Sequence, residues 1–192
     1  MATEGEVRDQ TEEEQEEARR DPQIEARRRV ALAQIRQYPD AVLRMRANEV
    51  ERFDDDLARL ADRMGRLMQE ARGVGLAATQ VGVLQRLFVF QAENEEGVIA
   101  VVNPEITARS RGTEVADEGC LSIQGVLVPV ERNLTVTLEG RDLAGQELRL
   151  ELDENDARVA QHELDHLDGV LMLARTDPES RREALATLRR RL

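Results

Sequence analysis

The chain has 192 residues, of which 41% are hydrophobic, and a formal net charge of −12 with 27 basic residues, all of them arginine. Length and composition fit one domain with an ordinary core, and the acidic charge makes the chain a poor general binder of nucleic acid or anionic membrane. The single cysteine excludes an internal disulfide. The N-terminus lacks the apolar segment of a signal peptide. No apolar run approaches the roughly 20 residues of a membrane span. We therefore expect a cytoplasmic protein without membrane contact or direct, specific nucleic-acid binding.

The N-terminal part of the chain predicts a polar extension followed by a folded domain. Residues 1–27 are expected to form an acidic, flexible extension, because the run at residues 12–17 has no apolar face to bury. Residues 28–192 are expected to form the domain. Within it, residues 54–71 predict an amphipathic helix, since apolar side chains recur there every three or four positions. Asp54 favours the start of this helix and Gly73 favours its end.

The middle of the chain predicts short strands, and the last third predicts helices. Strand composition occurs at residues 87–90, 98–102, 126–130, 134–138 and 147–152. Leu134, Val136 and Leu138 alternate with threonines, which is typical of a half-buried strand. Gly140 and Gly145 flank a turn signal that predicts a hairpin. Helices are predicted at residues 156–167 and 178–191, and strands followed by helices without βαβ alternation indicate an α+β fold.

Both histidines of the chain lie four residues apart, in the box His162-Glu163-Leu164-Asp165-His166. On an α-helix this spacing places the two rings on one face, from which both can reach one metal ion. The carboxylate of Glu163 can then reach water at the ion without binding the metal itself. The alternative is a chance match, with two solvated histidines on an acidic helix.

The only cysteine, Cys120, is a third candidate ligand. A thiolate and two imidazoles suit Fe²⁺, Zn²⁺, Ni²⁺ or Co²⁺, and three protein ligands leave a fourth position open, as in catalytic sites. The neighbouring Gly119 and polar flanks argue against a plain buried cysteine. Two alternatives stay open: Glu179 or Glu183 as the third ligand, and Cys120 as a nucleophile with a histidine base.

A small-residue segment, GVGLAATQ at residues 73–80, resembles a dinucleotide fingerprint only superficially. That fingerprint requires a preceding strand, whereas here a long helix precedes it. One interpretation is a helix end followed by a packing turn. The other is a strip of backbone open to an extended ligand, ending in the amide of Gln80.

Three boxes in this order resemble the peptide deformylase family: GVGLAATQ at residues 73–80, EGCLS at 118–122 and QHELDH at 161–166. The segment YPDAVLR at residues 38–44 also resembles the N-terminal region of that family, so the resemblance covers about residues 30–175. It implies an α+β fold in which antiparallel sheets pack around a central helix carrying the histidine box, with a C-terminal helix. It also implies that residues 28–192 are a catalytic domain.

The resemblance implies a metal-dependent hydrolase that removes the formyl group from the N-terminal formyl-methionine of newly synthesised polypeptides. Its substrates would be N-formyl-methionyl peptides. By the same resemblance Cys120, His162 and His166 bind one divalent ion, Fe²⁺ in cells, with Zn²⁺, Ni²⁺ or Co²⁺ as alternatives. Rival interpretations are a general metallopeptidase with a downstream glutamate ligand, and a structural metal module that binds a partner.

The resemblance also assigns roles around the reacting bond. Glu163 is the acid/base, while Gln80 and the backbone N–H of Leu121 face the reacting carbonyl. The backbone of three further residues would pair with the substrate peptide: Val74, Gly75 and Gly119.

The chain departs from the family pattern at four positions. Gln124 stands where proline is common, and Leu127 stands where tyrosine, phenylalanine or arginine is frequent. Asn155 and Asp156 stand where the family tends to be apolar. Because Leu127, Asn155 and Asp156 fall where side chains can line the methionine pocket or peptide groove, we expect them to affect substrate preference rather than metal chemistry.

The last predicted helix carries several arginines, at positions 181, 182, 189, 190 and 191. One interpretation is a helix that packs Leu185 and Leu188 and leaves its arginines in solvent. The other is an electrostatic contact with the ribosome, from which the substrate emerges.

Overall fold

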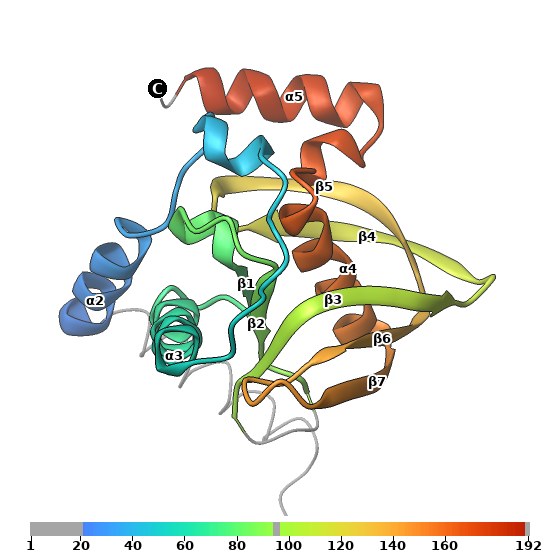
Figure 1. The fold of residues 1–192 in the computed structure, drawn as a ribbon. Helices are drawn as coiled ribbons and strands as arrows, with labels where there is room; N and C mark the ends of the chain where they lie inside the picture. The colour runs from blue at the N-terminus through green and yellow to red at the C-terminus, as the bar shows by residue number, and fades with distance from the viewer. Residues whose placement is uncertain (1–20, 94–96, 191–192) are drawn as a thin grey trace, which may run out of the picture.

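Two antiparallel sheets lie on either side of one buried helix in the computed structural model, which describes residues 21–93 and 97–190 (Figure 1). The larger sheet has the order β1-β2-β3-β6-β7, with bounds Gly75–Ala77, Leu87–Phe90, Ile99–Arg109, Thr135–Arg141 and Glu147–Asp153. The smaller sheet pairs β4 (Thr113–Cys120) with β5 (Ile123–Asn133). The helices are α2 (Pro22–Leu32), α3 (Asp55–Glu70), α4 (Glu154–Leu167) and α5 (Pro178–Arg189), with 3-10 turns η1 (Ala41–Arg44), η2 (Ala78–Val81) and η3 (Met172–Ala174).

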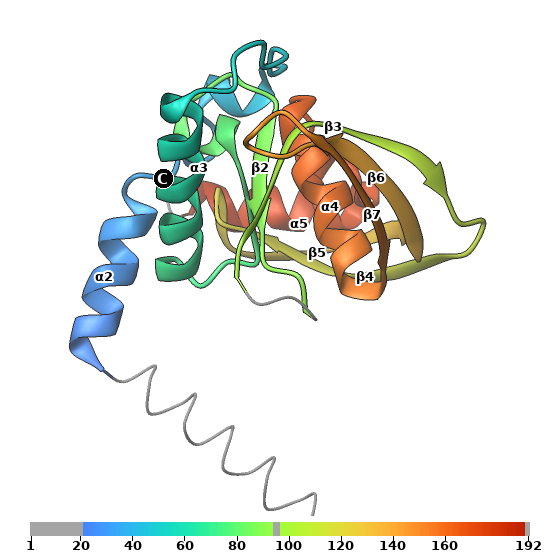
Figure 2. The same cartoon turned by 60° about the horizontal axis from the view of Figure 1, so that its bottom comes forward.

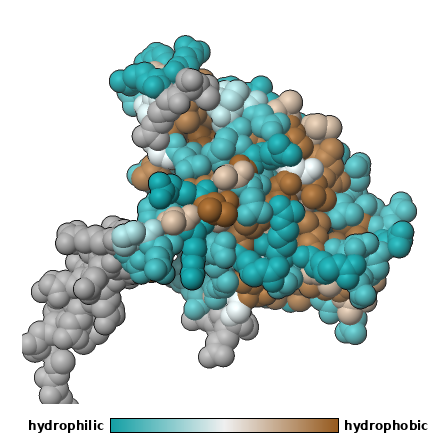
Figure 3. Space-filling view, turned by 90° about the vertical axis from the view of Figure 1, so that its left-hand side faces the viewer, coloured by the Kyte–Doolittle hydropathy of each residue, from teal (hydrophilic) through white to brown (hydrophobic). Residues whose placement is uncertain are grey.

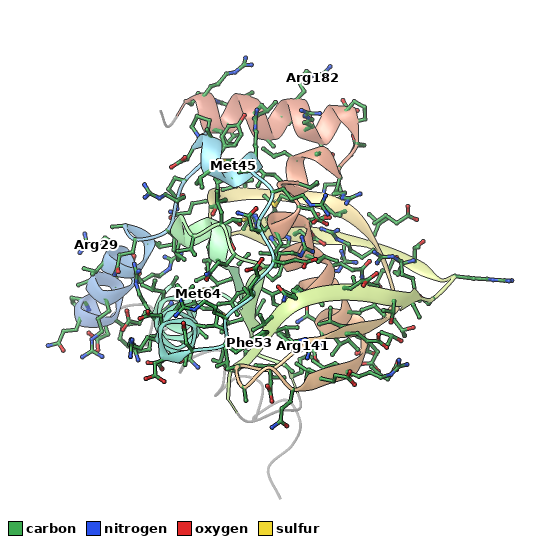
Figure 4. The ribbon with its side chains drawn as sticks, in the orientation of Figure 1. Arg29, Met45, Phe53, Met64, Arg141 and Arg182 are labelled. Atoms are coloured by element: carbon green, nitrogen blue, oxygen red, sulfur yellow. The ribbon has the colours of Figure 1, made fainter. Side chains whose placement is uncertain are left out.

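Helix α3 confirms the amphipathic helix predicted at residues 54–71. Asp54 caps it, because the Asp54 carboxylate accepts hydrogen bonds from the backbone N–H of Asp56 at 3.1 Å and Leu57 at 3.2 Å. The apolar face packs into the core beside β1 and β2, where Met64, labelled in Figure 4, is fully buried. This helix ends just before the small-residue segment, so it fixes where that segment begins.

The β6–β7 hairpin is confirmed at the predicted position. The Asp142 carboxylate accepts hydrogen bonds from the N–H groups of Ala144 and Gln146, each at 2.9 Å. Gly145 has a φ of +80°, which favours glycine. The larger sheet built on this hairpin covers one side of α4.

Two strands were not predicted, and each has a physical reason. β4, with the sequence TEVADEGC, belongs to a two-stranded sheet and is mostly exposed, so it lacks apolar alternation. β1 has only three residues, all buried, between a helix and a 3-10 turn. The prediction that Leu134 is buried with Val136 and Leu138 is wrong: Leu134 is 40% exposed, because it lies at the bend between β5 and β6.

Helix α4 is the central element, and most of its residues are buried. It contacts strands of both sheets, including β1, β2, β5 and β7. It starts at Glu154, two residues before the predicted start. The expected α+β fold, with antiparallel sheets around the helix that carries His162 and His166, is confirmed, as is the C-terminal helix.

The terminal helices pack against different parts of this core. α2 lies beside α3 (Figures 1 and 2), and the expected boundary between residues 27 and 28 falls inside it; residues 1–20 of the expected extension lie outside the described residues. α5 packs on β5 through Ala184 and Leu188, with Asp177 as its N-cap. Within the described ranges, every helix falls short of the length and apolarity that a membrane span requires.

Candidate metal centre

The three predicted ligands come together at one point. His162 and His166 lie one turn apart on α4, and Cys120 is the last residue of β4. The Nε2 atom of His166 lies 3.2 Å from Cys120 Sγ and 3.2 Å from His162 Nε2. All three donor atoms lie within 4.8 Å of one another, in a setting that is mostly buried.

This arrangement fits a tetrahedral metal ion with one open position. Bonds of about 2.3 Å to sulfur and about 2.0–2.1 Å to nitrogen, at tetrahedral angles, place neighbouring ligand atoms roughly 3.3–3.6 Å apart. The two measured separations of 3.2 Å are close to that spacing. Among the described residues, no further histidine, cysteine or carboxylate joins this group.

Glu118 fixes the orientation of His162. The Glu118 carboxylate lies 3.0 Å from His162 Nδ1, which leaves Nε2 directed at the other two ligands. Burial alone would raise the pKa of Glu118, but hydrogen bonds from His162 and from Arg132 outweigh it and lower the pKa to about 2. The group is therefore ionised at neutral pH, and as an acceptor for the Nδ1 proton it supports the ring as a metal ligand.

Arg132 is the centre of a buried charge network behind the ligands. Its guanidinium donates to Glu118 through Nε at 2.9 Å and Nη2 at 3.0 Å, and to Asp165 through Nη1 at 2.7 Å. Arg175 donates to the same Asp165 at 2.5 and 3.0 Å, and Arg158 donates to Glu118 at 3.0 Å. These contacts tie β4, β5, α4 and the segment after η3 together around the site.

The two histidines are electrostatically distinct. Burial alone would lower the pKa of His162, but contacts with Cys120 and Glu118 raise it above its usual range. Burial and the nearby charge of His162 lower the pKa of His166 below its usual range. The chain thus places one imidazole against carboxylate and thiol groups and keeps the other neutral.

Glu163 lies next to the ligands, in a tight space made by a glycine. It is 4% exposed, and its Oε2 is buried without a hydrogen-bond partner among the described residues, which leaves that atom available to water or substrate. A Cβ atom at Gly75 would overlap Glu163 Oε1, so glycine is required there. Burial raises the pKa of Glu163 to about 7, where a carboxyl group can both take and release a proton near neutral pH.

Gln80 is held in place at both ends of its amide. Its Oε1 accepts a hydrogen bond from the backbone N–H of Ala77 at 2.8 Å. Its Nε2 donates to Ser122 Oγ at 3.1 Å and lies 3.6 Å from Cys120 Sγ. Because the carbonyl end is fixed by Ala77, the NH₂ end must face the cysteine side of the site.

A cavity of about 740 Å³ opens from this centre, within the range typical of ligand sites. Among the described residues β1 pairs with β2 alone and β4 with β5 alone, so each leaves an open edge at the cavity. Residues of α2, α4 and β5 form further parts of its wall. The predicted peptide-binding residues and Leu121 all line it: Val74, Gly75, Gly119 and Leu121. Leu121 lies in the turn between β4 and β5, and its carbonyl accepts a hydrogen bond from Gln37 Nε2 at 3.0 Å, which holds the peptide between Leu121 and Ser122.

Glu179 and Glu183, the alternative third ligands, lie exposed on α5 and are not part of the ligand group. Because the thiol and both imidazole nitrogens lie within 4.8 Å of one another, the arrangement favours a metal site over a cysteine nucleophile with one histidine base. Sequence reasoning did not identify the roles of Arg132 and Arg175. The only signal for this network was Asp165, a second acidic residue inside the histidine box.

Three of the four departures from the family pattern lie in the cavity wall: Gln124, Leu127 and Asn155. Leu127 is 67% exposed, and a Cβ at Gly119 would lie 3.0 Å from Leu127 Cδ2. Asp156 does not line the cavity. Its carboxylate instead accepts a hydrogen bond from the backbone N–H of Glu93 at 3.3 Å.

Comparisons with known proteins agree with this site. The model of the family described as polypeptide deformylase matches residues 32–182. Peptide deformylase 1 of Corynebacterium glutamicum is 44% identical over 162 residues, covering 83% of this chain and 96% of the relative. The peptide deformylase of Thermotoga maritima is 45% identical over 150 residues, covering 78% of this chain and 90% of the relative.

Solved structures give the same result. A peptide deformylase from Legionella pneumophila superposes with a TM-score of 0.77 at 38% identity, covering 81% of this chain and 92% of that one. A peptide deformylase from Synechococcus elongatus, in complex with actinonin, gives a TM-score of 0.76 at 38% identity, covering 80% of this chain and 85% of that one.

Proposed function

The chain belongs to the polypeptide deformylase family, and on that premise we propose which of its residues carry out the reaction. As a member of this family it is a hydrolase that removes the N-formyl group from newly synthesised polypeptides. The observation that carries the residue assignments is the meeting of one cysteine and two histidines with Glu163 and Gln80 at one cavity.

Cys120, His162 and His166 would hold one divalent metal ion, and we propose Fe²⁺ as the ion used in cells. Zn²⁺, Ni²⁺ and Co²⁺ are the alternatives, because a thiolate with two imidazoles accepts all of them. When bound, such an ion lowers the pKa of a coordinated water and polarises a carbonyl oxygen.

Protein prepared without oxygen and with Fe²⁺ should therefore retain one ion per chain and deformylate formyl-methionyl peptides. Glu118→Gln should weaken metal affinity by about 10- to 100-fold, because it removes the carboxylate that orients His162. Cys120→Ala should weaken it further, because a ligand itself is lost. Metal analysis after dialysis measures both effects, and full occupancy of the Cys120→Ala protein would remove this residue from the ligand set.

Glu163 acts as the acid and base of the reaction. Its buried carboxylate takes a proton from the attacking water and then delivers that proton to the amine that leaves. Burial raises the pKa of this carboxyl group to about 7, and a cation held by the neighbouring ligands would lower it toward the charged form, which is the form that takes the proton. Gly75 gives the carboxylate the room that this position requires.

Gln80 and the backbone N–H of Leu121 stabilise the negative charge that develops on the formyl oxygen. Support comes from the fixed amide of Gln80, whose NH₂ faces the Cys120 side, and from the position of Leu121 directly after the ligand. Donors that are already oriented need not rearrange during the reaction, which is why they accelerate it.

Gln80→Leu should lower kcat by about 10²- to 10³-fold, the typical cost of losing one such donor, with metal content unchanged. Ser122→Ala is the matched control, because it removes the hydroxyl that Gln80 Nε2 contacts but keeps the amide. Steady-state rates on a formyl-methionyl peptide measure both variants. Equal losses in the two would mean that Gln80 acts through its contact with Ser122 and not as a donor to substrate.

The substrate peptide would lie as an added strand between the edges of β1 and β4. The N–H of Val74, whose carbonyl already accepts from Gln91 N–H at 2.9 Å, and main-chain groups of Gly75 would bond its backbone on one side. Main-chain groups of Gly119 would bond it on the other side. Both edges are open among the described residues, and both residues at the β1 end and Gly119 line the cavity. This binding mode recognises the backbone and leaves the side-chain pockets to set preference.

We also propose that α5 contacts the ribosome, which would place the protein in the cytoplasm where formylated chains are made. The support is its exposed arginines, of which Arg182 points away from the protein body in Figure 4. Reversing Arg181, Arg182 and Arg189 to glutamate should weaken salt-sensitive co-sedimentation with ribosomes but leave rates on short peptides unchanged. The control reverses the exposed Arg59, Arg63 and Arg66 of α3, and equal losses in both proteins would contradict a specific contact.

A further inference from the structure

Helix α2 ends where the family match begins, at residue 32, and yet it forms part of the active-site cavity. Arg28 and Leu32 of this helix line the same cavity as Cys120 and Glu163. Arg28 therefore adds a piece of wall from outside the matched family region, which begins at Leu32.

The helix is firmly positioned rather than loosely attached. Asp21 caps its start, where the Asp21 carboxylate accepts from Gln23 N at 2.8 Å. At its end Ala31 is fully buried and Leu32 is 9% exposed, both within the core cluster that contains α3. Figures 1 and 2 show α2 beside α3 in both views, and Figure 3 shows this side of the molecule as largely hydrophilic, with smaller hydrophobic areas.

Arg28 presents a positive charge that its neighbours satisfy only in part. Its Nη1 lies 3.6 Å from Glu25, an ion pair in which both side chains are more than a third exposed. Its Nε is buried without a hydrogen-bond partner among the described residues. Such a guanidinium can bind the carboxylate of a ligand without first breaking a buried ion pair.

The chain leads from the metal centre to this helix along one wall of the cavity. Gly75 adjoins Glu163, and the residues before it, Val74 and Gly73, continue the wall toward Ala71. An extended peptide advances by about 3.3 Å per residue. A substrate lying along this wall, as in the binding mode proposed above, would carry its third or fourth residue toward α2.

We propose that Arg28 is a specificity-determining residue that favours formyl-methionyl peptides with aspartate or glutamate at the third or fourth position. The inference rests on the proposed peptide orientation. Asp117 also lines the cavity, from β4. Arg72 and Arg158 line the cavity as well, so its charges differ from one wall to another. The preference then depends on which wall the side chain faces, and positions three and four must be tested separately.

The test compares the full-length protein with Arg28→Gln and Arg28→Glu. Substrates are formyl-Met-Ala-Glu-Ser and formyl-Met-Ala-Ser-Glu, each against its glutamine counterpart. The wild type should prefer one glutamate peptide by about 2- to 5-fold in kcat/KM, the range of a solvent-accessible ion pair, mainly through KM. Arg28→Gln should abolish this preference and Arg28→Glu should reverse it.

Arg29→Gln and Arg29→Glu are the matched controls, since Arg29 is exposed on the same helix and does not line the cavity (Figure 4). They should keep the wild-type preference. If the Arg28 and Arg29 variants changed the preference for glutamate peptides equally, the effect would come from overall charge and the proposal would be overturned. An unchanged preference in Arg28→Gln would also overturn it. If the wild type had no activity on any of the four peptides, that result would instead contradict the proposed function.

Discussion

Replacing Glu163 with glutamine should lower kcat/KM on formyl-methionyl peptides by about 10²- to 10⁴-fold, the usual contribution of general acid–base catalysis. Glutamine has nearly the same shape but cannot take or release a proton at neutral pH. The Glu163 side chain is almost fully buried against Gly75, so a substitution of equal size keeps the packing of this corner. The loss should therefore appear in the chemical step.

Three measurements separate a lost proton-transfer group from a damaged site. Metal content and thermal unfolding of the Glu163→Gln protein should match those of the wild type. Binding of a formyl-methionyl peptide should also persist, because the proposed contacts to its backbone come from β1 and β4. A metal-loaded Glu163→Gln protein with wild-type turnover would exclude Glu163 as the acid and base.

Replacing Arg132 with methionine should lower the free energy of unfolding by about 3–5 kcal/mol, the cost of breaking a buried ion pair on one side. Arg132 is 6% exposed and supplies three hydrogen bonds to two buried carboxylates, Glu118 and Asp165. Arg158 and Arg175 remain as partners of those carboxylates, which places the expected loss toward the lower end of the range.

Urea unfolding measures this loss, with Arg149→Met as the control. Arg149 also pairs with two carboxylates, but its side chain is 62% exposed, so its replacement should change stability little. The Arg132→Met protein should also hold metal less tightly, because Glu118 would orient His162 less firmly. If both methionine variants unfolded at the same urea concentration, the buried network would not be a source of stability.

Local patterns predicted the parts of the site that depend on a single segment. The four-residue spacing of His162 and His166 needs only a helix, and the helix formed. The position of the small-residue segment before Gln80 depends only on where the preceding helix ends. Helix α3 ends at Glu70, just before that segment. Cys120 was predicted from its flanks, although the strand that delivers it was not.

The parts that the sequence did not reveal depend on contacts between distant segments. Arg132 is 33 residues from Asp165 in the chain, and no local pattern indicates that pairing. β4 is polar because one face of a small sheet lies in solvent, so the apolar alternation used to predict strands is missing. Helix α2 has little amphipathic character, and the two residues that bury it, Ala31 and Leu32, stand at its very end.

The two open strand edges have a consequence for the whole molecule. β1 belongs to the five-stranded sheet and β4 to the two-stranded sheet, and α4 lies between the sheets. A peptide bonded to both edges would join them into one hydrogen-bonded array across the active site. Substrate would then be a temporary structural element, and the interior of the protein would be most rigid while the formyl group is being removed.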